Sequence, residues 1–408
     1  MFDWWHEADA KARRSLVAAS LGWMLDSFDV MLYALVVQGV MADLSIDART
    51  GGQMQSYTLV ASAAGGLMFG VIADRFGRTR ALILSVLIYS IFTAACGLAQ
   101  NVAQLAVFRV LLGIGMGGEW ASGAALVSET WSAEHRGKAL GFMQSAWAIG
   151  FAGAAVVNAL VLPVWGWRAV FFIGILPAFF TIWIRRRVDE PEIWRAAQRA
   201  HPASRGRFTD IFRGSLLRLT IAVTLMNACT MFAWWGFNLW LPGYLSLPVE
   251  QGGVGLSVRV MSVLVFVMQI GMWFGYVSFG FISDAVGRRR TYVVYLLAAA
   301  ALILAYTATT SAVLLLMLGP VVAFFATGYF SGFGAVTAEI YPTDIRATAQ
   351  GFTYNIGRVA SAVAPFAVGS LSESRGFAFA LSISAAAFLL AAATWIWIPE
   401  TKGRALAG

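Results

Sequence analysis

Residues 70–80 of the chain read GVIADRFGRTR, and residues 280–290 read GFISDAVGRRR. Six of the eleven positions are identical, and the two segments lie 210 residues apart. A second pair of segments, 129–142 and 339–352, shares a glutamate, an arginine, an alanine, a glycine and a phenylalanine at the same offset. One constant offset that relates two separate motifs predicts a chain made of two similar halves with parallel topology.

The composition indicates a membrane protein. Of the 408 residues, 59% are hydrophobic and only 12% are charged, whereas a soluble protein has about 45–50% apolar and about 25% charged residues. Seven runs of at least 24 residues contain no Asp, Glu, Lys or Arg, and about 20 apolar residues cross a bilayer as a helix. An ordinary soluble protein is therefore excluded.

Hydropathy, with breaks at Gly, Pro and charged residues, predicts an all-α membrane protein with twelve membrane-spanning helices. We expect them near 16–40, 53–73, 81–99, 104–127, 138–161, 167–185, 219–245, 258–281, 291–309, 312–334, 348–371 and 376–398. The predicted organisation is two pseudo-symmetric six-helix bundles, residues 1–185 and 215–408, joined by a cytoplasmic linker over residues 186–214.

The charges are distributed unevenly about these spans. Of the 29 Lys and Arg residues, 23 fall in segments on one side, four fall on the other side, and Arg109 and Arg358 fall inside spans. Positive charge accumulates on the cytoplasmic side of membrane proteins, so both termini are predicted to be cytoplasmic. The net charge of +8 thus reflects topology and not nucleic-acid binding. Cys96 and Cys229 lie in apolar runs and indicate neither a disulfide framework nor a metal site.

Several motifs together resemble the major facilitator superfamily over essentially the whole chain. They are the Gly-x-x-x-Asp-Arg-x-Gly-Arg segment at 70–78, its counterpart at 280–288, Arg109-x-x-x-Gly113-x-Gly115, and the Pro-Glu pairs at 191–192 and 399–400. The resemblance implies a secondary transporter whose substrate site lies near the bilayer midplane between two six-helix halves.

Three shorter segments narrow the resemblance. Leu25-Asp-Ser-Phe-Asp29, Gly115-Met-Gly-Gly-Glu-Trp120 and Ile356-Gly-Arg358 are similar to the bacterial organic-acid/proton symporters. That group includes sialate, lactate–pyruvate, aromatic-acid and nicotinate carriers. It implies a small organic anion as substrate and a proton as the coupling ion.

Four ionisable residues inside the spans are candidates for proton coupling: Asp26, Asp29, Arg109 and Glu119. A charge at the bilayer centre costs at least about 2.5–3.5 kcal/mol, and Asp26 and Asp29 are spaced to share a helix face. All three histidines lie outside the spans, so a carboxylate must carry the proton. We expect Asp29 to alternate between pairing with Arg109 and a protonated state, with Asp26 and Glu119 as alternatives. A static ion pair between helices is the competing interpretation.

Polar and aromatic residues at helical spacing predict a substrate cavity. The candidates are Gln144, Trp147, Asn227, Trp234, Asn238, Gln269, Trp273, Asn355 and Arg358. Arg358 has no Asp or Glu in its own predicted span, and its planar guanidinium fits a carboxylate. The alternatives for Arg358 are a pair with a buried acid or with helix carbonyls.

A cytoplasmic gate is predicted from the charges repeated in both halves. Its candidates are Asp74, Arg75, Arg78, Glu129, Arg136, Asp284, Arg288, Glu339 and Arg346. We expect Asp74 and Asp284 to cap the following helices or to pair with arginines across the seam between the halves, and Glu339 to find a partner in Arg346. The alternative is that these charges only set topology.

The expected function is proton symport of a small organic anion, a monocarboxylate, by alternating access across the bacterial inner membrane. The protein is expected to be a monomer without cofactor or metal. A proton-coupled carrier of a neutral solute, such as a sugar, remains open, as does a non-transporting receptor or scaffold. An enzyme is disfavoured, because the Gly-x-Gly-x-x-Gly string at 113–118 lies inside an apolar helix with no strand before it.

Overall fold

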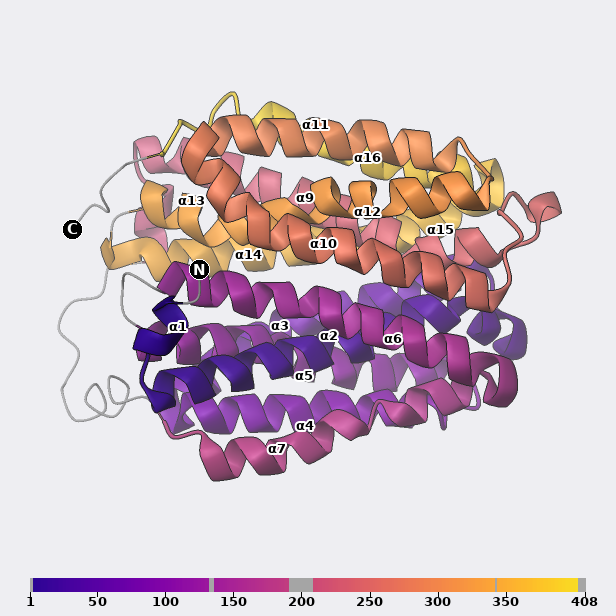
Figure 1. The fold of residues 1–408 in the computed structure, drawn as a ribbon, viewed down its shortest axis with the longest axis horizontal. Helices are drawn as coiled ribbons and strands as arrows, with labels where there is room; N and C mark the ends of the chain where they lie inside the picture. Colours follow the sequence, from indigo (N-terminus) through magenta and orange to yellow (C-terminus); the bar gives the residue numbers. More distant parts are fainter. Residues whose placement is uncertain (1–2, 132–135, 191–207, 342, 403–408) are drawn as a thin grey trace. The chain divides into compact units, whose positions relative to one another are not determined.

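The computed structural model describes residues 3–131, 136–190, 208–341 and 343–402. In these ranges the chain is α-helical, with short 3-10 turns and no strand. The described residues fall into two compact units, one of residues 1–46 and 57–202 and the other of residues 47–56 and 203–408. The long helices of each unit run side by side (Figure 1).

Six long helices and a short one precede the linker. They are α1 (Asp3–Glu7), α2 (Ala10–Leu44), α3 (Ala48–Phe76), α4 (Arg78–Cys96), α5 (Val102–Thr130), α6 (Arg136–Ile173) and α7 (Leu176–Arg187). Helix α6 contains the fifth predicted span and the start of the sixth, with a kink at Gly166, where φ is 73°.

The rest of the chain supplies the other six spans. They are formed by α9 (Ser215–Ser246), α10 (Val258–Val286), α11 (Arg288–Thr307), α12 (Ala312–Gly328) with α13 (Phe333–Ile340), α14 (Thr343–Ser361) with α15 (Val363–Arg375), and α16 (Phe377–Thr394). Within the described residues, nine helical stretches are long and apolar enough to cross a membrane, and one of them, Ala139–Ile184, has 46 residues. The twelve-helix membrane fold predicted from the sequence is confirmed.

The first turns of α3 belong to the second unit. Asp47 caps α3 by accepting a hydrogen bond from the Thr50 backbone N–H at 2.8 Å, and bonds from the Thr50 side chain and backbone hold the pKa of Asp47 below its ordinary value. The Arg49 N–H donates to Glu373 at the end of α15 (3.0 Å). Gly52 lies directly against the carbonyl of Pro365, which leaves no room for a side chain at that position.

The sequence repeat at 70–80 and 280–290 corresponds to two equivalent helix junctions. Gly77 separates α3 from α4 with φ 115° and ψ 150°, and Gly287 separates α10 from α11 with φ 112° and ψ 148°. Only glycine adopts these angles without strain.

A glutamate caps the helix that follows each glycine. Glu190 accepts hydrogen bonds from two backbone N–H groups in the first turn of α4, each at 3.2 Å. Glu400 accepts them from Arg288 (2.8 Å) and Arg289 (3.1 Å) in the first turn of α11. The two glutamates are themselves 210 residues apart, and each satisfies orphan donors at the positive end of a helix dipole.

The environment of Glu400 keeps it ionised. Burial alone would raise the pKa of Glu400, but hydrogen bonds from the backbone N–H groups of Lys402, Arg288, Arg289 and Thr401 together hold that pKa below its ordinary value. The carboxylate therefore remains an acceptor throughout the neutral pH range.

The junction glycines can be tested by substitution. Gly287→Ala places a Cβ only 2.8 Å from the Glu400 carboxylate at a backbone angle that disfavours side chains, so we expect a loss of about 1–3 kcal/mol in the free energy of unfolding. Gly280→Ala is the matched control, because nothing lies within 4 Å of its Cβ. It should leave the thermal unfolding midpoint in detergent unchanged or raise it, and equal destabilisation by both changes would contradict the assignment.

Candidate functional site

Buried ionisable side chains gather in the first unit, on α2 and α5. Asp26, Asp29, Arg109 and Glu119 are each at most 1% exposed. Around them, Tyr89 of α4 lies within electrostatic range of all three carboxylates. The structure therefore brings together the acids that the sequence singled out, at a depth where charge is costly.

Arg109 is held against an aromatic ring. Its guanidinium carbon lies 4.3 Å from the ring centroid of Tyr33 on α2, a cation–π contact worth about 2 kcal/mol when it is shielded from water. The Arg109 carbonyl accepts a hydrogen bond from the Thr58 hydroxyl (3.2 Å), which ties α3 to α5. The role of Tyr33 was not predicted, since it depends on how α2 and α5 pack.

Glu119 lies against a helix that carries glycine at the point of contact. A Cβ at Gly22 would collide with the Glu119 carboxylate, so a larger residue on α2 would displace the acid. The Tyr89 hydroxyl donates to the Gly22 carbonyl at 3.4 Å. These contacts place Glu119 at the packing interface between α2 and α5.

Asp29 is buried beside one hydroxyl side chain and one other acid. Neither of its carboxylate oxygens accepts a hydrogen bond within the described part of the chain; Thr93 and Asp26 are its polar neighbours. Cys96 lies within electrostatic range of both Asp29 and Arg109, but no hydrogen bond joins the two among the described residues. The alternation of Asp29 between Arg109 and a protonated state stays a prediction.

The predicted cavity residues of the first unit pack against α2 and α5, the two helices that carry the buried acids. Trp147 of α6 lies 4.6 Å from Trp23 of α2, centroid to centroid, and its carbonyl accepts a hydrogen bond from Ser27 at 2.7 Å. Gln144 accepts a hydrogen bond from the Trp120 indole at 3.3 Å. Both predicted residues therefore lie on the side of α6 that faces α2 and α5.

In the second unit, a glycine brings Arg358 close to α9. A Cβ at Gly357 would lie 3.0 Å from the Cβ of Asn227 and 3.3 Å from the backbone nitrogen of Ala228. The backbones of α14 and α9 can therefore approach only because residue 357 is glycine. This close approach explains the glycine at 357 and sets the residue before Arg358 against Asn227 of α9.

Arg358 is a buried cation. Its side chain is 5% exposed, and its guanidinium carbon lies 5.3 Å from the ring of Tyr354. Among the described residues of the second unit, no carboxylate lies within ion-pair distance of it. Among the described residues of that unit, the charge is thus compensated by the face of Tyr354.

Amide groups near this helix pair retain acceptor capacity. Asn227 Oδ1 and Gln269 Oε1 are buried without a hydrogen-bond partner in the described part of the chain, while Gln269 and Asn238 donate to carbonyls of their own helices at 2.9 Å and 3.0 Å. Asn355 donates to Gly351 at 3.1 Å. Unmatched buried acceptors can be satisfied by a ligand or by water.

The two tryptophans predicted for the cavity of this unit pack against other aromatic rings. Trp234 packs edge-on against Trp235 (4.7 Å) and Phe330 (6.1 Å), and Trp273 against Phe274 (5.2 Å). All the predicted substrate residues are therefore found in one unit or the other, on α6, α9, α10 and α14. No group of His, Cys, Asp and Glu in the described ranges is arranged to hold a metal ion.

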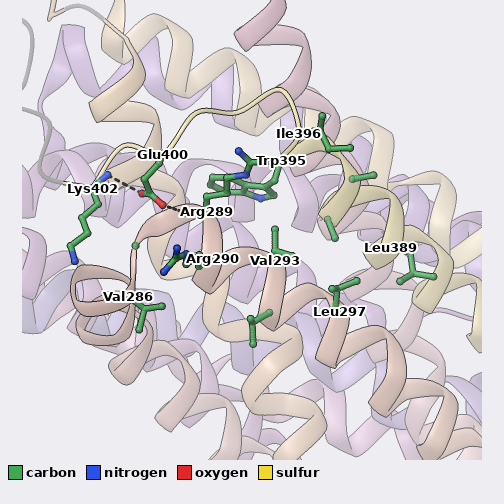
Figure 2. A pocket seen from close by; sticks show the side chains of 14 residues that line it. Val286, Arg289, Arg290, Val293, Leu297, Leu389, Trp395, Ile396, Glu400 and Lys402 are labelled. Atoms are coloured by element: carbon green, nitrogen blue, oxygen red, sulfur yellow. Dashed lines mark hydrogen bonds between the residues drawn. The ribbon is translucent and has the colours of Figure 1, made fainter.

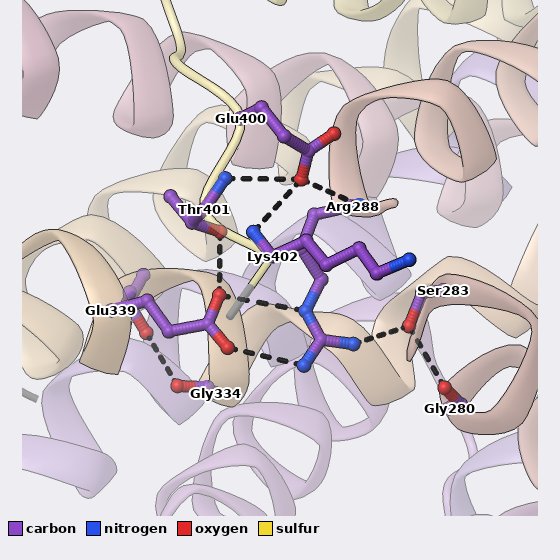
Figure 3. A network of polar contacts seen from close by, with 9 residues as sticks. Gly280, Ser283, Arg288, Gly334, Glu339, Glu400, Thr401 and Lys402 are labelled. Carbon is purple, nitrogen blue, oxygen red and sulfur yellow. Dashed lines mark hydrogen bonds and ion pairs between the residues drawn. The ribbon is translucent and has the colours of Figure 1, made fainter. Parts of the chain in front are cut away.

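One predicted gate residue, Arg288, is part of a polar network at the start of α11. Its guanidinium donates to the Glu339 carboxylate at 3.1 Å and 3.4 Å and to Ser283 at 2.6 Å. Thr401 donates its hydroxyl to the same carboxylate, so Glu339 is held from two directions (Figure 3). Arg288 of the same unit is thus an observed partner of Glu339. The contact expected with Arg346 stays a prediction, because the side chain of Arg346 lies outside the described residues.

The remaining gate candidates are only partly visible. Arg78 begins α4 and is half-buried. The side chains of the other six, Asp74, Arg75, Glu129, Arg136, Asp284 and Arg346, lie outside the described residues. Glu190 and Glu400 accept hydrogen bonds in the first turns of α4 and α11. The caps expected from Asp74 and Asp284 stay predictions. Glu190 could have been found by subtracting the repeat offset from Glu400.

The Arg288–Glu339 contact predicts a difference between two arginines. Arg288→Lys keeps the charge but cannot reach Glu339 and Ser283 together, so we expect the free energy of unfolding to fall by about 1–3 kcal/mol. Arg289→Lys is the matched control, because Arg289 is exposed and its side chain has no partner in the described ranges. Thermal unfolding in detergent measures both, and an unchanged midpoint for Arg288→Lys would rule out a stabilising role.

Comparison with known proteins agrees with this architecture. Residues 19–252 and 245–408 match the Major Facilitator Superfamily. A protein of Cupriavidus pinatubonensis named "Probable 4-methylmuconolactone transporter" is 32% identical over 413 residues, which span 100% of this chain and 95% of that protein. The cis,cis-muconate transport protein of Acinetobacter baylyi is 29% identical over 379 residues, 91% of this chain and 90% of the relative.

A solved structure is similar in fold. The crystal structure of a D-xylose-proton symporter matches with a TM-score of 0.78 at 20% identity, covering 97% of this chain and 100% of the symporter. The repeated motifs and the twelve spans are distributed over both halves, the family match covers residues 19–408, and the chain therefore belongs to the Major Facilitator Superfamily.

Proposed function

We propose that the protein is a secondary transporter that moves a small organic anion together with a proton across the bacterial inner membrane by alternating access. The observation that carries the proposal is Arg358, a buried cation with no carboxylate partner among the described residues of its own unit. Relatives named for muconate and methylmuconolactone transport support an organic acid as the cargo. The expected substrate is a monocarboxylate.

Arg358 is suited to bind the carboxylate group. A guanidinium is ionised at every accessible pH and presents two parallel N–H donors to a carboxylate. The tryptophans of α9 and α10 and the free acceptors of Asn227 and Gln269 suit a substrate with an apolar body and a hydrogen-bond donor. Because an uncompensated buried charge is costly, binding the anion also stabilises the site.

Asp29 is the acid we propose for the proton. A carboxylate that is buried away from water is poorly stabilised when ionised, whereas its protonated form is compatible with burial. Protonation of Asp29 and binding of an anion at Arg358 each remove one uncompensated charge. With both bound, neither residue carries an uncompensated charge inside the membrane. The conformational change that carries the substrate across would therefore require the proton and the anion together.

The remaining assignments follow from this mechanism. We propose cytoplasmic termini, a monomeric protein that needs no cofactor, and a gating role for the charged helix ends, of which Arg288 and Glu339 are the described pair. A neutral hydroxylated solute is the second candidate, since the free acceptors of Asn227 and Gln269 would fit hydroxyl groups.

Asp29→Asn tests the proton site. The amide cannot release a proton, so uphill uptake driven by an inward proton gradient should be lost, while exchange of substrate across the membrane persists. Asp43→Asn is the matched control on the same helix, because Asp43 is 46% exposed and paired with Arg168. Both variants are compared in proteoliposomes, and uphill uptake by Asp29→Asn at the wild-type level would assign coupling to another residue.

Substitution of Arg358 tests the anion site. Arg358→Lys keeps the charge but loses the planar fork, so the apparent substrate affinity should fall about 10-fold or more, and Arg358→Ala should nearly stop transport. The same changes at Arg375, an exposed arginine that also lies over a ring (5.3 Å from Phe379), are the control. Normal transport by Arg358→Ala would favour the neutral solute.

A further inference from the structure

A groove opens on the surface of the second unit where α10 and α16 end and α11 begins. Its volume is about 1000 Å³. Arg289, Arg290 and Lys402 lie at one end, and apolar side chains such as Leu297 and Leu389 lie at the other (Figure 2). The groove is separate from the buried residues on α9 and α14.

The charged end of the groove is positive. Arg289 and Arg290 are exposed, and neither guanidinium has a partner within the described residues. Lys402 donates one hydrogen bond to the Ala285 carbonyl at 2.8 Å and keeps its charge unpaired. Glu400 also lines the groove, but its carboxylate is occupied by four backbone N–H groups. Three cations and one anion leave a net charge of about +2.

The other walls are apolar and lie on membrane-spanning helices. Val294 of α11 is 57% exposed, Leu389 of α16 is 48% exposed, and Ile396 beyond the end of α16 is 71% exposed. Such surfaces on spanning helices face lipid chains and not water. Trp395 also lines the groove; it is 1% exposed, and its indole N–H has no hydrogen-bond partner in the described ranges.

We propose that this groove binds one anionic glycerophospholipid. The phosphate lies against Arg289, Arg290 and Lys402, and the acyl chains follow the apolar side chains of α11 and α16. Charge complementarity selects the anionic headgroup, since each Lys or Arg near an anionic membrane surface contributes about 1 kcal/mol, about fivefold in binding. A free anion in solution would not need the apolar wall.

The repeat indicates that the site belongs to the second unit alone. The offset of 210 places Thr79 at the position of Arg289, and Glu192 at the position of Lys402. Two of the three cations are therefore missing from the equivalent positions of the first half. One bound anionic lipid per chain is the expected stoichiometry at this type of site.

Native mass spectrometry of the detergent-purified protein tests the site. The protein is incubated with phosphatidylglycerol or with phosphatidylcholine of the same acyl chains, and retained lipid is counted. The wild type should retain one phosphatidylglycerol in preference to phosphatidylcholine. In the triple variant Arg289→Gln/Arg290→Gln/Lys402→Gln, we expect retention of phosphatidylglycerol to fall at least about 10-fold.

A charge-matched control removes three exposed arginines that do not line the groove, in the triple variant Arg186→Gln/Arg187→Gln/Arg218→Gln. This control should retain the lipid. A second variant, Val294→Trp, fills the apolar wall while it keeps every charge, and should also lose the lipid. Unchanged retention in the groove variants would overturn the proposal. Equal retention of phosphatidylcholine by the wild type would overturn it as well, because it would show binding without headgroup recognition.

Discussion

The cost of keeping ionised groups inside a membrane-spanning bundle determines much of this structure. In the first unit, three acids and one arginine are buried within α2 and α5, with Tyr33 stacked on the arginine. Among the described residues of the second unit, the buried charge is Arg358, which lies over Tyr354. A fold that needed only stability would lose nothing by replacing such groups with apolar side chains, so their presence favours a role in moving protons and anions.

The two halves share a backbone design and differ in their charges. Equivalent glycines turn the chain at 77 and 287, and equivalent glutamates cap the helices that follow. Beside the second cap, Arg289 and Lys402 line the groove that we assign to a lipid, and the equivalent positions of the first half carry Thr79 and Glu192. Duplication of one helical unit thus provides the scaffold, and substitutions within one copy provide its specific sites.

The sequence was sufficient to predict the membrane class, the twelve spans and the repeat, because apolar runs and a constant offset are properties of the chain alone. The helix ends were less predictable. Helix α6 continues past the expected end of the fifth span to a glycine kink, and the tenth and eleventh spans are each divided between two helices, since tertiary packing can stabilise bends that hydropathy does not reveal.

For the site, the sequence identified the residue types but not their partners. Burial of Asp29 and Arg358 followed from their positions in apolar runs. The contact of Arg109 with Tyr33 and the pairing of Glu339 with Arg288 depend on how helices pack, which no spacing rule encodes. The glutamate caps were not predicted, because Glu190 lies far from α4 in the sequence.

Proton flux coupled to substrate entry is the most direct measurement of the central claim. Proteoliposomes that contain the protein and an internal pH-sensitive dye are given, one at a time, a panel of organic acids and neutral sugars, with protein-free liposomes as the reference for passive entry of acid. We expect an organic acid to acidify the interior in proportion to its protein-dependent uptake, and a protonophore to abolish accumulation. Protein-dependent uptake of the acid without proton entry, or uptake of sugars alone, would contradict proton symport of an organic anion.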